Sequence, residues 1–289
     1  WEYDHDVLVV GGGIVGCSLT CRVAQDLATL NDTTTAATTA GASATTSSAA
    51  ASGAARGGGV SASPAGGIGD ASGRRRPSVG LIEARPPAPL AVAMAKDGPD
   101  PRVYSLTPSS VRVLRKIGVW DKEGDGGGGG KSVLAERSQP FGGMQVWDDR
   151  GPGHLRFDSE GGEGGNGKGA LGFISEHGVI HSALFERARE LEEEGLAELI
   201  TSLSLPRHPP PSPFCSVQVK RVTFPSVGSG GAVGPIKVTV ETAGGETSEV
   251  SCRLLVAADG GDSKVAKMLG LSSFGWGYGQ RAVVATVSI

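Results

Sequence analysis

An apolar strand that runs directly into a glycine-rich turn is the feature that most constrains this chain. Residues 6–10 read Asp-Val-Leu-Val-Val, and the next residues, Gly11 to Gly16, match the pattern G-x-G-x-x-G. An apolar stretch with helical character follows from Ile14 to Leu27. A strand, a glycine turn and a helix in this order make up the phosphate-binding unit of dinucleotide-binding folds.

Each of the three motif glycines has its own expected role. Gly11 permits a tight turn, Gly13 lets the backbone approach a pyrophosphate, and Gly16 lets the helix pack closely on the strand. The start of the helix then offers N–H groups to an anion. A bare match would carry little weight in a chain with 47 glycines, but the flanking strand and helix strengthen it. The sequence therefore predicts an α/β fold with a dinucleotide site, and a plain turn is the alternative.

The motif alone does not distinguish NAD from FAD. Its position close to the N-terminus favours FAD, because flavoproteins commonly carry FAD on their first βαβ unit. An acidic residue at the end of the second strand, about 20 residues beyond the glycines, usually accepts hydrogen bonds from the ribose. No such residue occurs at that spacing, but Glu83 ends the apolar run 79–82. Glu83 is the predicted ribose ligand, and a solvated surface glutamate is the alternative.

A long insert explains why Glu83 comes so late. Residues 28–78 are mostly Ala, Thr, Ser and Gly, with almost no large apolar side chain. Such a segment buries too little surface to offset its ordering entropy, so we predict a disordered insert. The basic run 74–76 within it is interpreted as solvated linker charge rather than a nucleic-acid contact.

Composition is typical of a soluble enzyme. The chain has 289 residues, a formal net charge of −3 and no apolar run long enough to span a membrane. The near-neutral charge argues against a nucleic-acid partner. The four cysteines form no C-x-x-C pair and are predicted to be reduced and structural. His177 and His181 share a helix face at a spacing that suits a metal, but no third ligand is apparent, so no metal is predicted.

A second candidate motif follows a buried-type strand, 254–258. Segments 236–242 and 247–252 read as a hairpin before it, and Asp259-Gly260 comes directly after it. The carboxyl end of such a strand is where α/β sheets bind ligands. Asp259 and Gly260 are therefore candidate cofactor-binding residues, although Asp-Gly is equally a favoured turn pair.

Together these motifs resemble the class A FAD-dependent aromatic monooxygenases, and within that class the mitochondrial ubiquinone-biosynthesis hydroxylases. The glycine and Asp-Gly motifs mark the whole class, whereas the blocks 144–148 and 280–287 are more specific to the ubiquinone hydroxylases. The resemblance covers residues 6–25, 102–121, 144–158, 171–184 and 254–287.

The resemblance implies a Rossmann-like FAD-binding domain, like that of para-hydroxybenzoate hydroxylase, with part of a β-sheet substrate domain. Residues 1–135 and 171–270 would form the two parts of the FAD-binding domain. Residues 136–170 would supply strands of the substrate domain, and residues 271–289 would begin its remainder.

The activity implied by the resemblance is hydroxylation of the aromatic ring of a polyprenylated phenol or benzoate in ubiquinone biosynthesis, through a flavin hydroperoxide formed with O2. The electron donor would be NAD(P)H or a ferredoxin with its reductase. The protein would sit peripherally on the matrix face of the mitochondrial inner membrane, within reach of a multi-protein ubiquinone-synthesis complex. Arg102 matches an arginine that the family places near the flavin, and a surface salt bridge is its alternative. No catalytic base is identified.

The chain departs from the family in four places. Ala266 stands where the family usually has Arg, and His177 stands where it usually has Asn. The family's third FAD motif is absent, and the chain runs from Trp1 to Ile289 without an initial Met. We therefore expect a fragment that is inactive on its own. Another flavin hydroxylase, a polyprenyl reductase and an inactive FAD-binding module remain the alternatives.

Overall fold

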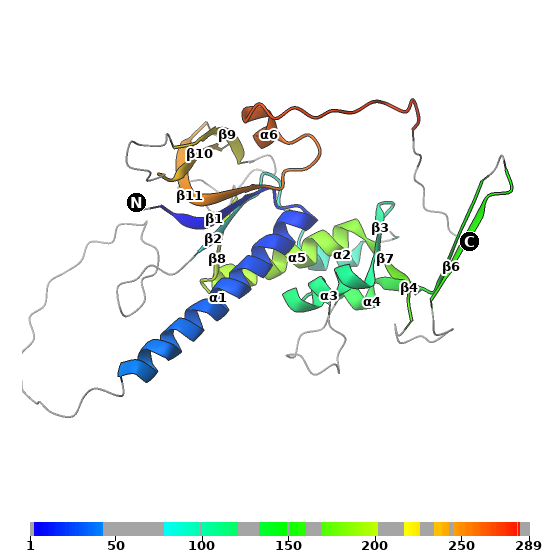
Figure 1. Cartoon of the computed structure of the whole chain (residues 1–289), viewed down its shortest axis with the longest axis horizontal. Coiled ribbons are helices and arrows are strands. Elements are labelled where there is room, and N and C mark those ends of the chain that lie inside the picture. Colours follow the sequence, from blue (N-terminus) through cyan, green and yellow to red (C-terminus); the bar gives the residue numbers. More distant parts are fainter. Residues whose placement is uncertain are drawn as a thin grey trace, which may run out of the picture.

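A six-stranded sheet lies at the centre of the protein (Figure 1). Its strands, in spatial order, are β8 (Ala197–Ile200), β2 (Val79–Ile82), β1 (His5–Val10), β11 (Thr247–Ala257), β10 (Ile236–Glu241) and β9 (Gln218–Thr223). The computed structural model describes residues 3–42, 78–96, 98, 100–120, 133–148, 151–159, 169–201, 217–225, 234–242, 245–281 and 283.

Four neighbouring strands of this sheet run parallel. β1 pairs with β2 on one edge and with β11 on the other, and β2 pairs with β8. The register places Val10 beside Ile82 and Ala257, so the strands end level with one another. Their carboxyl ends therefore meet at one edge of the sheet, and the α/β fold predicted from the sequence is confirmed.

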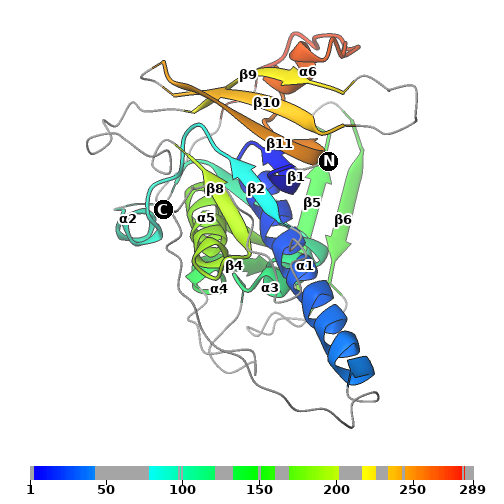
Figure 2. The same cartoon turned by 90° about the vertical axis from the view of Figure 1, so that its left-hand side faces the viewer.

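The sheet separates two apolar clusters, because successive side chains of a strand point to opposite faces. Val9, Leu81 and Leu199 point toward the helices, where they pack with buried residues of α1 (Ile14–Ala42) and α5 (His177–Glu193). Leu8, Val10, Ile82 and Ile200 point to the opposite face, where β9, β10 and the short helix α6 (Lys264–Met268) cover them. Figure 2 shows this layering, with α6 over the strands and the long helices on the other side.

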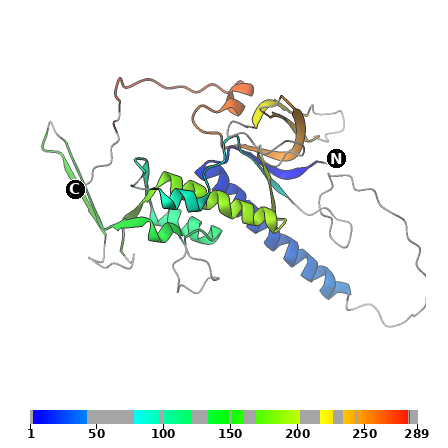
Figure 3. The same cartoon turned by 180° about the vertical axis from the view of Figure 1, so that it is seen from behind.

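The helix α1 extends further than the sequence indicates. It continues to Ala42, into the segment predicted to be disordered, whereas the apolar pattern ends near Leu27. Adding a residue to an existing helix fixes few dihedral angles for each new hydrogen bond, so an Ala- and Thr-rich segment can prolong it. Figures 1 and 3 show this end of α1 projecting past α5. The rest of the predicted insert, residues 43–77, lies outside the described residues.

Two smaller sheets lie beyond the helices. β3 (Val103–Leu106), β7 (Gly172–Glu176) and β4 (Ser138–Phe141) form a three-stranded antiparallel sheet. β5 (Gly143–Trp147) and β6 (His154–Asp158) form a separate ribbon at the far end of the molecule (Figure 3). Strands expected in residues 136–170 therefore form, as β4, β5 and β6, but they divide between two sheets. The remaining helices are α2 (Leu90–Ala95), α3 (Pro108–Ile117) and α4 (Val133–Glu136).

Two expectations for the C-terminal part of the sequence, a hairpin and a buried strand, have different outcomes. The predicted hairpin is confirmed, since β10 and β11 pair antiparallel with Val238 opposite Val250. The predicted buried strand at 254–258 is wrong in part, because it is the end of β11 and Leu254 is 54% exposed. The pairing of β11 with β10 ends at Cys252, so the last residues of β11 have β1 on one edge only. Within residues 271–289, which were expected to begin the remainder of the substrate domain, residues 271–281 form no helix or strand, and most of residues 282–289 lie outside the described residues.

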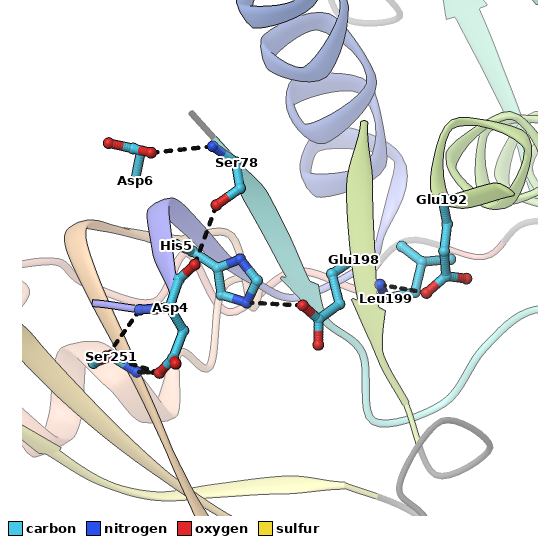
Figure 4. A network of polar contacts seen from close by, with 8 residues as sticks. All are labelled: Asp4, His5, Asp6, Ser78, Glu192, Glu198, Leu199 and Ser251. Carbon is cyan, nitrogen blue, oxygen red and sulfur yellow. Dashed lines mark hydrogen bonds and ion pairs between the residues drawn. The ribbon is translucent and has the colours of Figure 1, made fainter. Parts of the chain in front are cut away.

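A polar network ties the amino ends of the strands together (Figure 4). Ser78 donates to the Asp6 carboxylate at 3.1 Å, and Ser251 donates to the Asp4 carboxylate at 2.7 Å. The His5 ring reaches from β1 to Glu198 on β8, with 3.5 Å between Nε2 and Oε2. These contacts join four strands at the edge of the sheet opposite the glycine turn.

His5 explains why the central strand β2 contains a glycine. Gly80 pairs with Leu8 on one side and with Glu198 on the other, so the imidazole must cross over it. A Cβ at position 80 would lie 2.9 Å from His5 Cδ2 and 2.9 Å from Leu8 Cδ1. The absence of a side chain at Gly80 makes room for the contact between His5 and Glu198.

We predict that Gly80→Ala lowers the free energy of unfolding by about 1–3 kcal/mol, because overpacking a filled site forces its neighbours to shift. Chemical denaturation followed by circular dichroism measures this value. Gly261→Ala is the control, since a Cβ there would meet no atom within 4 Å. Equal stability of the two variants would contradict the crossing of His5 over β2.

Candidate functional site

The glycine turn lies where the parallel strands end, between β2 and β11. The Gly11 N–H donates to the carbonyl of Ile82 at 2.8 Å, and the Ala258 N–H donates to the carbonyl of Val10 at 2.7 Å. The turn is therefore hydrogen-bonded to the strand on each side. The structure brings the first predicted motif into contact with the segments that carry Glu83 and Asp259.

Gly11 and Gly16 are required by the protein's own packing. Gly11 has a φ of +103°, and a Cβ on it would lie 2.5 Å from the carbonyl oxygen of Ala258. A Cβ on Gly16 would lie 1.7 Å from the carbonyl oxygen of Gly11. Real Cβ contacts are never this short, so the turn and its packing on the helix exclude any side chain at either position.

Gly13 differs from the other two motif glycines. A Cβ built on Gly13 meets no atom within 4 Å, and its φ lies outside the left-handed region. The protein itself would accept a side chain there. Gly13 is adjacent to the first residue of α1, whose first turn contains no acidic residue. The start of a long helix with open space beside it is a favourable place for an anion.

Glu83 lies directly beside the turn, as its predicted role requires. Its Oε2 accepts a short hydrogen bond from the Gly12 N–H, and its Oε1 accepts one from the Arg85 N–H at 2.6 Å. A carboxylate has about four acceptor positions, so two backbone donors leave capacity for ligand hydroxyls. The carboxylate is also held in place before any ligand binds.

Asp259 and Gly260 form a turn against Gly11. A Cβ on Gly11 would lie 2.7 Å from the Asp259 Cα, and Gly260 has a φ of +90°. The Asp259 carboxylate faces α6, where it accepts from the Ser263 hydroxyl at 2.6 Å and from the Lys264 N–H at 2.7 Å. Its side chain therefore organises the start of α6, and its backbone is the part that borders the glycine turn.

Arg102 lies further away, just before β3. Its guanidinium lies over the Tyr104 ring at 5.6 Å, and its carbonyl accepts the His177 N–H at 2.9 Å. It forms no ion pair with the other described residues, so the salt-bridge alternative gains no support there. The positive charge is exposed and held at the start of α5.

A row of rings connects Arg102 with the glycine turn. Tyr104 and His177 lie edge to face at 5.4 Å, and His177 and His181 are 5.7 Å apart. His181 Nε2 then lies 2.6 Å from the carbonyl oxygen of Gly12. The spacing of the two histidines would suit a metal, but in the structure His181 contacts the Gly12 carbonyl instead. Among the described residues, no group of three or more metal-ligating side chains occurs.

Cys17 also contacts the turn, which the sequence did not predict. Its Sγ lies 2.9 Å from the carbonyl oxygen of Gly12. Burial is the main cause that raises the pKa of this thiol far above its usual range, with the Cys21 thiol adding to the effect. Burial likewise raises the pKa of Cys21 to about 12. Both side chains therefore remain thiols at neutral pH, and Cys17 can donate its proton to the carbonyl.

The surroundings of His177 favour its neutral form. Burial is the largest cause that lowers its pKa from the ordinary 6.5, and the positive charges of Arg102 and His181 lower it further. Asp100 acts in the opposite direction. The unfolded chain would thus take up a proton near pH 6.5 that the folded protein does not bind.

We predict that this difference makes the fold less stable as the pH falls below 6.5. The unfolded state binds more protons there, so the free energy of unfolding decreases on acidification. His177→Gln should lose less stability than the unmodified protein between about pH 7.5 and about pH 5.5. Thermal midpoints across this range measure the effect, and identical slopes for both proteins would contradict it.

Comparisons with known proteins support the resemblance predicted from the sequence. The mitochondrial ubiquinone biosynthesis monooxygenase COQ6 of Dictyostelium discoideum is 24% identical over 288 residues, covering 99% of this chain and 43% of that protein. The corresponding protein of Xenopus tropicalis is 30% identical over 188 residues, covering 65% of this chain and 33% of that protein. The 3-demethoxyubiquinol 3-hydroxylase of Escherichia coli K12 is 25% identical over 210 residues, covering 73% of this chain and 42% of that protein. The resemblance to the ubiquinone-biosynthesis hydroxylases is thus confirmed.

The chain spans less than half the length of the curated relatives it matches, at 43%, 33% and 42% of the three named above. No protein-family model matches it. Among solved structures, the p-nitrophenol 4-monooxygenase of Pseudomonas putida DLL-E4 aligns with a TM-score of 0.50 at 12% identity, covering 93% of this chain and 44% of that one. This alignment confirms the predicted fold class. The described part of the chain contains no helix that is long and apolar enough to cross a membrane.

Proposed function

We propose that this chain binds FAD at the Gly11–Gly16 turn and forms part of a monooxygenase that hydroxylates a polyprenylated aromatic precursor of ubiquinone. The observation that carries the proposal is the contrast among the three glycines. Gly11 and Gly16 meet the protein itself, whereas a Cβ on Gly13 meets nothing within 4 Å. A glycine that the fold does not need, beside the start of a long helix, suits a bound pyrophosphate.

The residues around the turn suit the other parts of FAD. Glu83 is held beside Gly12 with acceptor capacity left over, which suits the two hydroxyls of a ribose. The backbone at Asp259 and Gly260 borders the turn closely enough to line the same ligand. These residues are the proposed cofactor-binding set, together with Arg102.

The roles that we assign to the protein are binding, orientation and electrostatics. N–H groups at the start of α1 would hold the pyrophosphate, and Glu83 would accept from the ribose. The positive charge of Arg102 would favour an anionic ring system or a phenolate nearby. Bound FAD, once reduced, supplies the activation of O2 and the transfer of one oxygen atom to an electron-rich ring.

We further infer the division of the chain that the resemblance implies. Residues 1–135 and 171–270 would contribute the FAD-binding domain, and residues 136–170 and 271–289 would contribute to the substrate domain. The β5–β6 ribbon supports this division, because it lies far from the large sheet (Figure 3). The ribbon also carries the exposed apolar side chains of Trp147 and Leu155. β4 pairs with β7, which falls in the part assigned to the FAD-binding domain. This pairing favours placing β4 in the FAD-binding domain as well, with the start of the substrate domain near Gly142.

The partners and location of the protein follow from the same proposal. The chemistry requires an aromatic substrate, O2 and a reductant, which would be NAD(P)H or a ferredoxin with its reductase. The two relatives from Dictyostelium discoideum and Xenopus tropicalis carry the description mitochondrial in their names. We propose a peripheral position on the matrix face of the inner membrane, where a polyprenylated substrate and a ubiquinone-synthesis complex would be within reach.

We predict that Gly13→Val weakens FAD binding at least 100-fold, about 2.7 kcal/mol, without changing the fold. The added Cβ would meet no protein atom within 4 Å, and its two methyl groups would occupy the place of the pyrophosphate. Quenching of FAD fluorescence measures the affinity, and the thermal midpoint of the protein without FAD measures the fold. Gly275→Val is the control, because a Cβ at position 275 also meets no atom within 4 Å, and it should alter neither the FAD affinity nor the thermal midpoint. Undiminished FAD binding by Gly13→Val would contradict the assignment.

Ring hydroxylation is tested by expressing the monooxygenase of which this chain is proposed to form part in cells that lack their own ubiquinone-ring hydroxylase. We expect ubiquinone to be restored and the unhydroxylated prenylated phenol to disappear, as measured by mass spectrometry. Reduction of the polyprenyl tail instead would favour the reductase alternative. FAD binding without any product would favour an FAD-binding module.

A further inference from the structure

The backbone N–H and the backbone carbonyl of Gly12 are held by side chains from three different elements. The Gly12 N–H donates to Glu83, which follows β2. The carbonyl oxygen of Gly12 lies 2.9 Å from Cys17 Sγ on α1 and 2.6 Å from His181 Nε2 on α5. A carbonyl oxygen has two lone pairs, so these two donors satisfy it completely.

The chemistry of the contact fixes the proton on His181. A carbonyl oxygen only accepts, so Nε2 must carry hydrogen. Both the neutral tautomer with hydrogen on Nε2 and the doubly protonated ring meet this requirement. The buried Cys17 thiol is protonated as well, so the two side chains act on the carbonyl in the same way.

The orientation of this carbonyl determines the direction of the next N–H. The Gly12 carbonyl and the Gly13 N–H belong to one planar peptide, and the described residues include no cis peptide bond. In a trans peptide the carbonyl and the N–H point in opposite directions. The contacts with His181 and Cys17 orient the Gly12 carbonyl toward α5 and α1. The Gly13 N–H therefore points away from these two helices.

The helix that carries His181 is well anchored. Ile180 and Leu184 flank His181 in the sequence of α5 and are fully buried in the cluster shared with α1. The helix begins where β7 ends, and Figure 1 shows it beside the first turns of α1. The imidazole is therefore presented to the turn by a rigid element rather than by a loop.

We propose that His181 is a positioning residue of the phosphate site, which orients the Gly12–Gly13 peptide so that the Gly13 N–H is ready to bind an anion. The proposal rests on the proposed function, because the anion in question is the pyrophosphate of FAD. His181 would not contact the cofactor. It would raise the affinity by removing the need to reorient the peptide on binding.

The test compares two substitutions of His181. His181→Leu removes the donor and keeps an apolar side chain of moderate size, and it should weaken FAD binding about tenfold. His181→Gln keeps an N–H donor at similar reach and should bind FAD within about threefold of the unmodified protein. An unchanged affinity in His181→Leu, or equal losses in both variants, would overturn the proposal.

Ser182→Ala is the matched control. Ser182 follows His181 on α5 and donates to the carbonyl of Ala88 at 2.8 Å, outside the glycine turn. Its substitution removes an equivalent bond between the same helix and a different segment. We expect a lower thermal midpoint with unchanged FAD affinity. A loss of affinity as large as that of His181→Leu would show general destabilisation and would overturn the proposal.

Cys17→Ala completes a double-mutant cycle. Each single variant leaves the Gly12 carbonyl with one donor, whereas the pair leaves it with none. The double variant should therefore lose more FAD affinity than the product of the two single losses. Independent, multiplicative losses would mean that the two side chains do not act on the same group and would count against the proposal.

A measurement without FAD separates the two proposals. The ¹⁵N chemical shifts of the His181 ring report which nitrogen carries hydrogen, and amide hydrogen exchange reports the order of the turn. We expect hydrogen on Nε2, and faster exchange in the turn of His181→Leu than in that of His181→Gln. Failure of the unmodified chain to bind FAD would contradict the proposed function alone. A ring with hydrogen only on Nδ1 would contradict the role of His181 alone.

Discussion

Strand β1 is hydrogen-bonded along both edges, to β2 and to β11, through the same residues Val7 to Val10. Because all three strands are parallel and in register, the three segments that follow them leave the sheet at one point. Gly11 follows β1, Glu83 follows β2, and Ala258 leads from β11 into Asp259. The candidate site exists because this pairing holds, and the contacts of the glycine turn with Ile82, Glu83 and Ala258 derive from it.

The three motif glycines illustrate how function can be separated from folding within one motif. A Cβ on Gly11 would clash with the Ala258 carbonyl, and a Cβ on Gly16 would clash with the Gly11 carbonyl. Their identity is explained by the chain alone. A Cβ on Gly13 would have no such neighbour, which is the basis for our proposal that a pyrophosphate binds beside it. Side chains from α1 and α5 then fix the peptide that precedes Gly13, so the turn is ordered before it is occupied.

Local sequence predicted the elements of the site and left their contacts open. The alternation of apolar residues and the glycine spacing predicted β1, α1 and the hairpin of β10 and β11, because these patterns follow from the geometry of single elements. Glu83 was placed correctly at a strand end. The contact of His181 with Gly12 joins residues far apart in the chain and depends on how α5 packs on α1, which no local pattern encodes. The spacing of His177 and His181 identified their shared helix face but did not indicate that His181 contacts the Gly12 carbonyl.

Burial was harder to predict than secondary structure. The run 254–257 is apolar enough for a fully covered strand, yet Leu254 is 54% exposed. The cause is the length of β10, which stops pairing at Cys252 and leaves the end of β11 with one neighbour. A strand's own sequence does not state how far its neighbour extends.

The place of β1 in the sheet has a consequence for how the protein acquires its fold during synthesis. β1 comes before the other described strands in the chain and pairs with β11, and the contact between Asp4 and Ser251 joins residues 247 positions apart. Loop closure over such distances raises contact order and slows folding, since the entropy is lost before the contacts form. The edge of β1 that pairs with β11 must therefore remain unpaired until β11 has been made. A chaperone that shields the nascent N-terminal segment would therefore influence the yield of folded protein more than the stability of the finished fold.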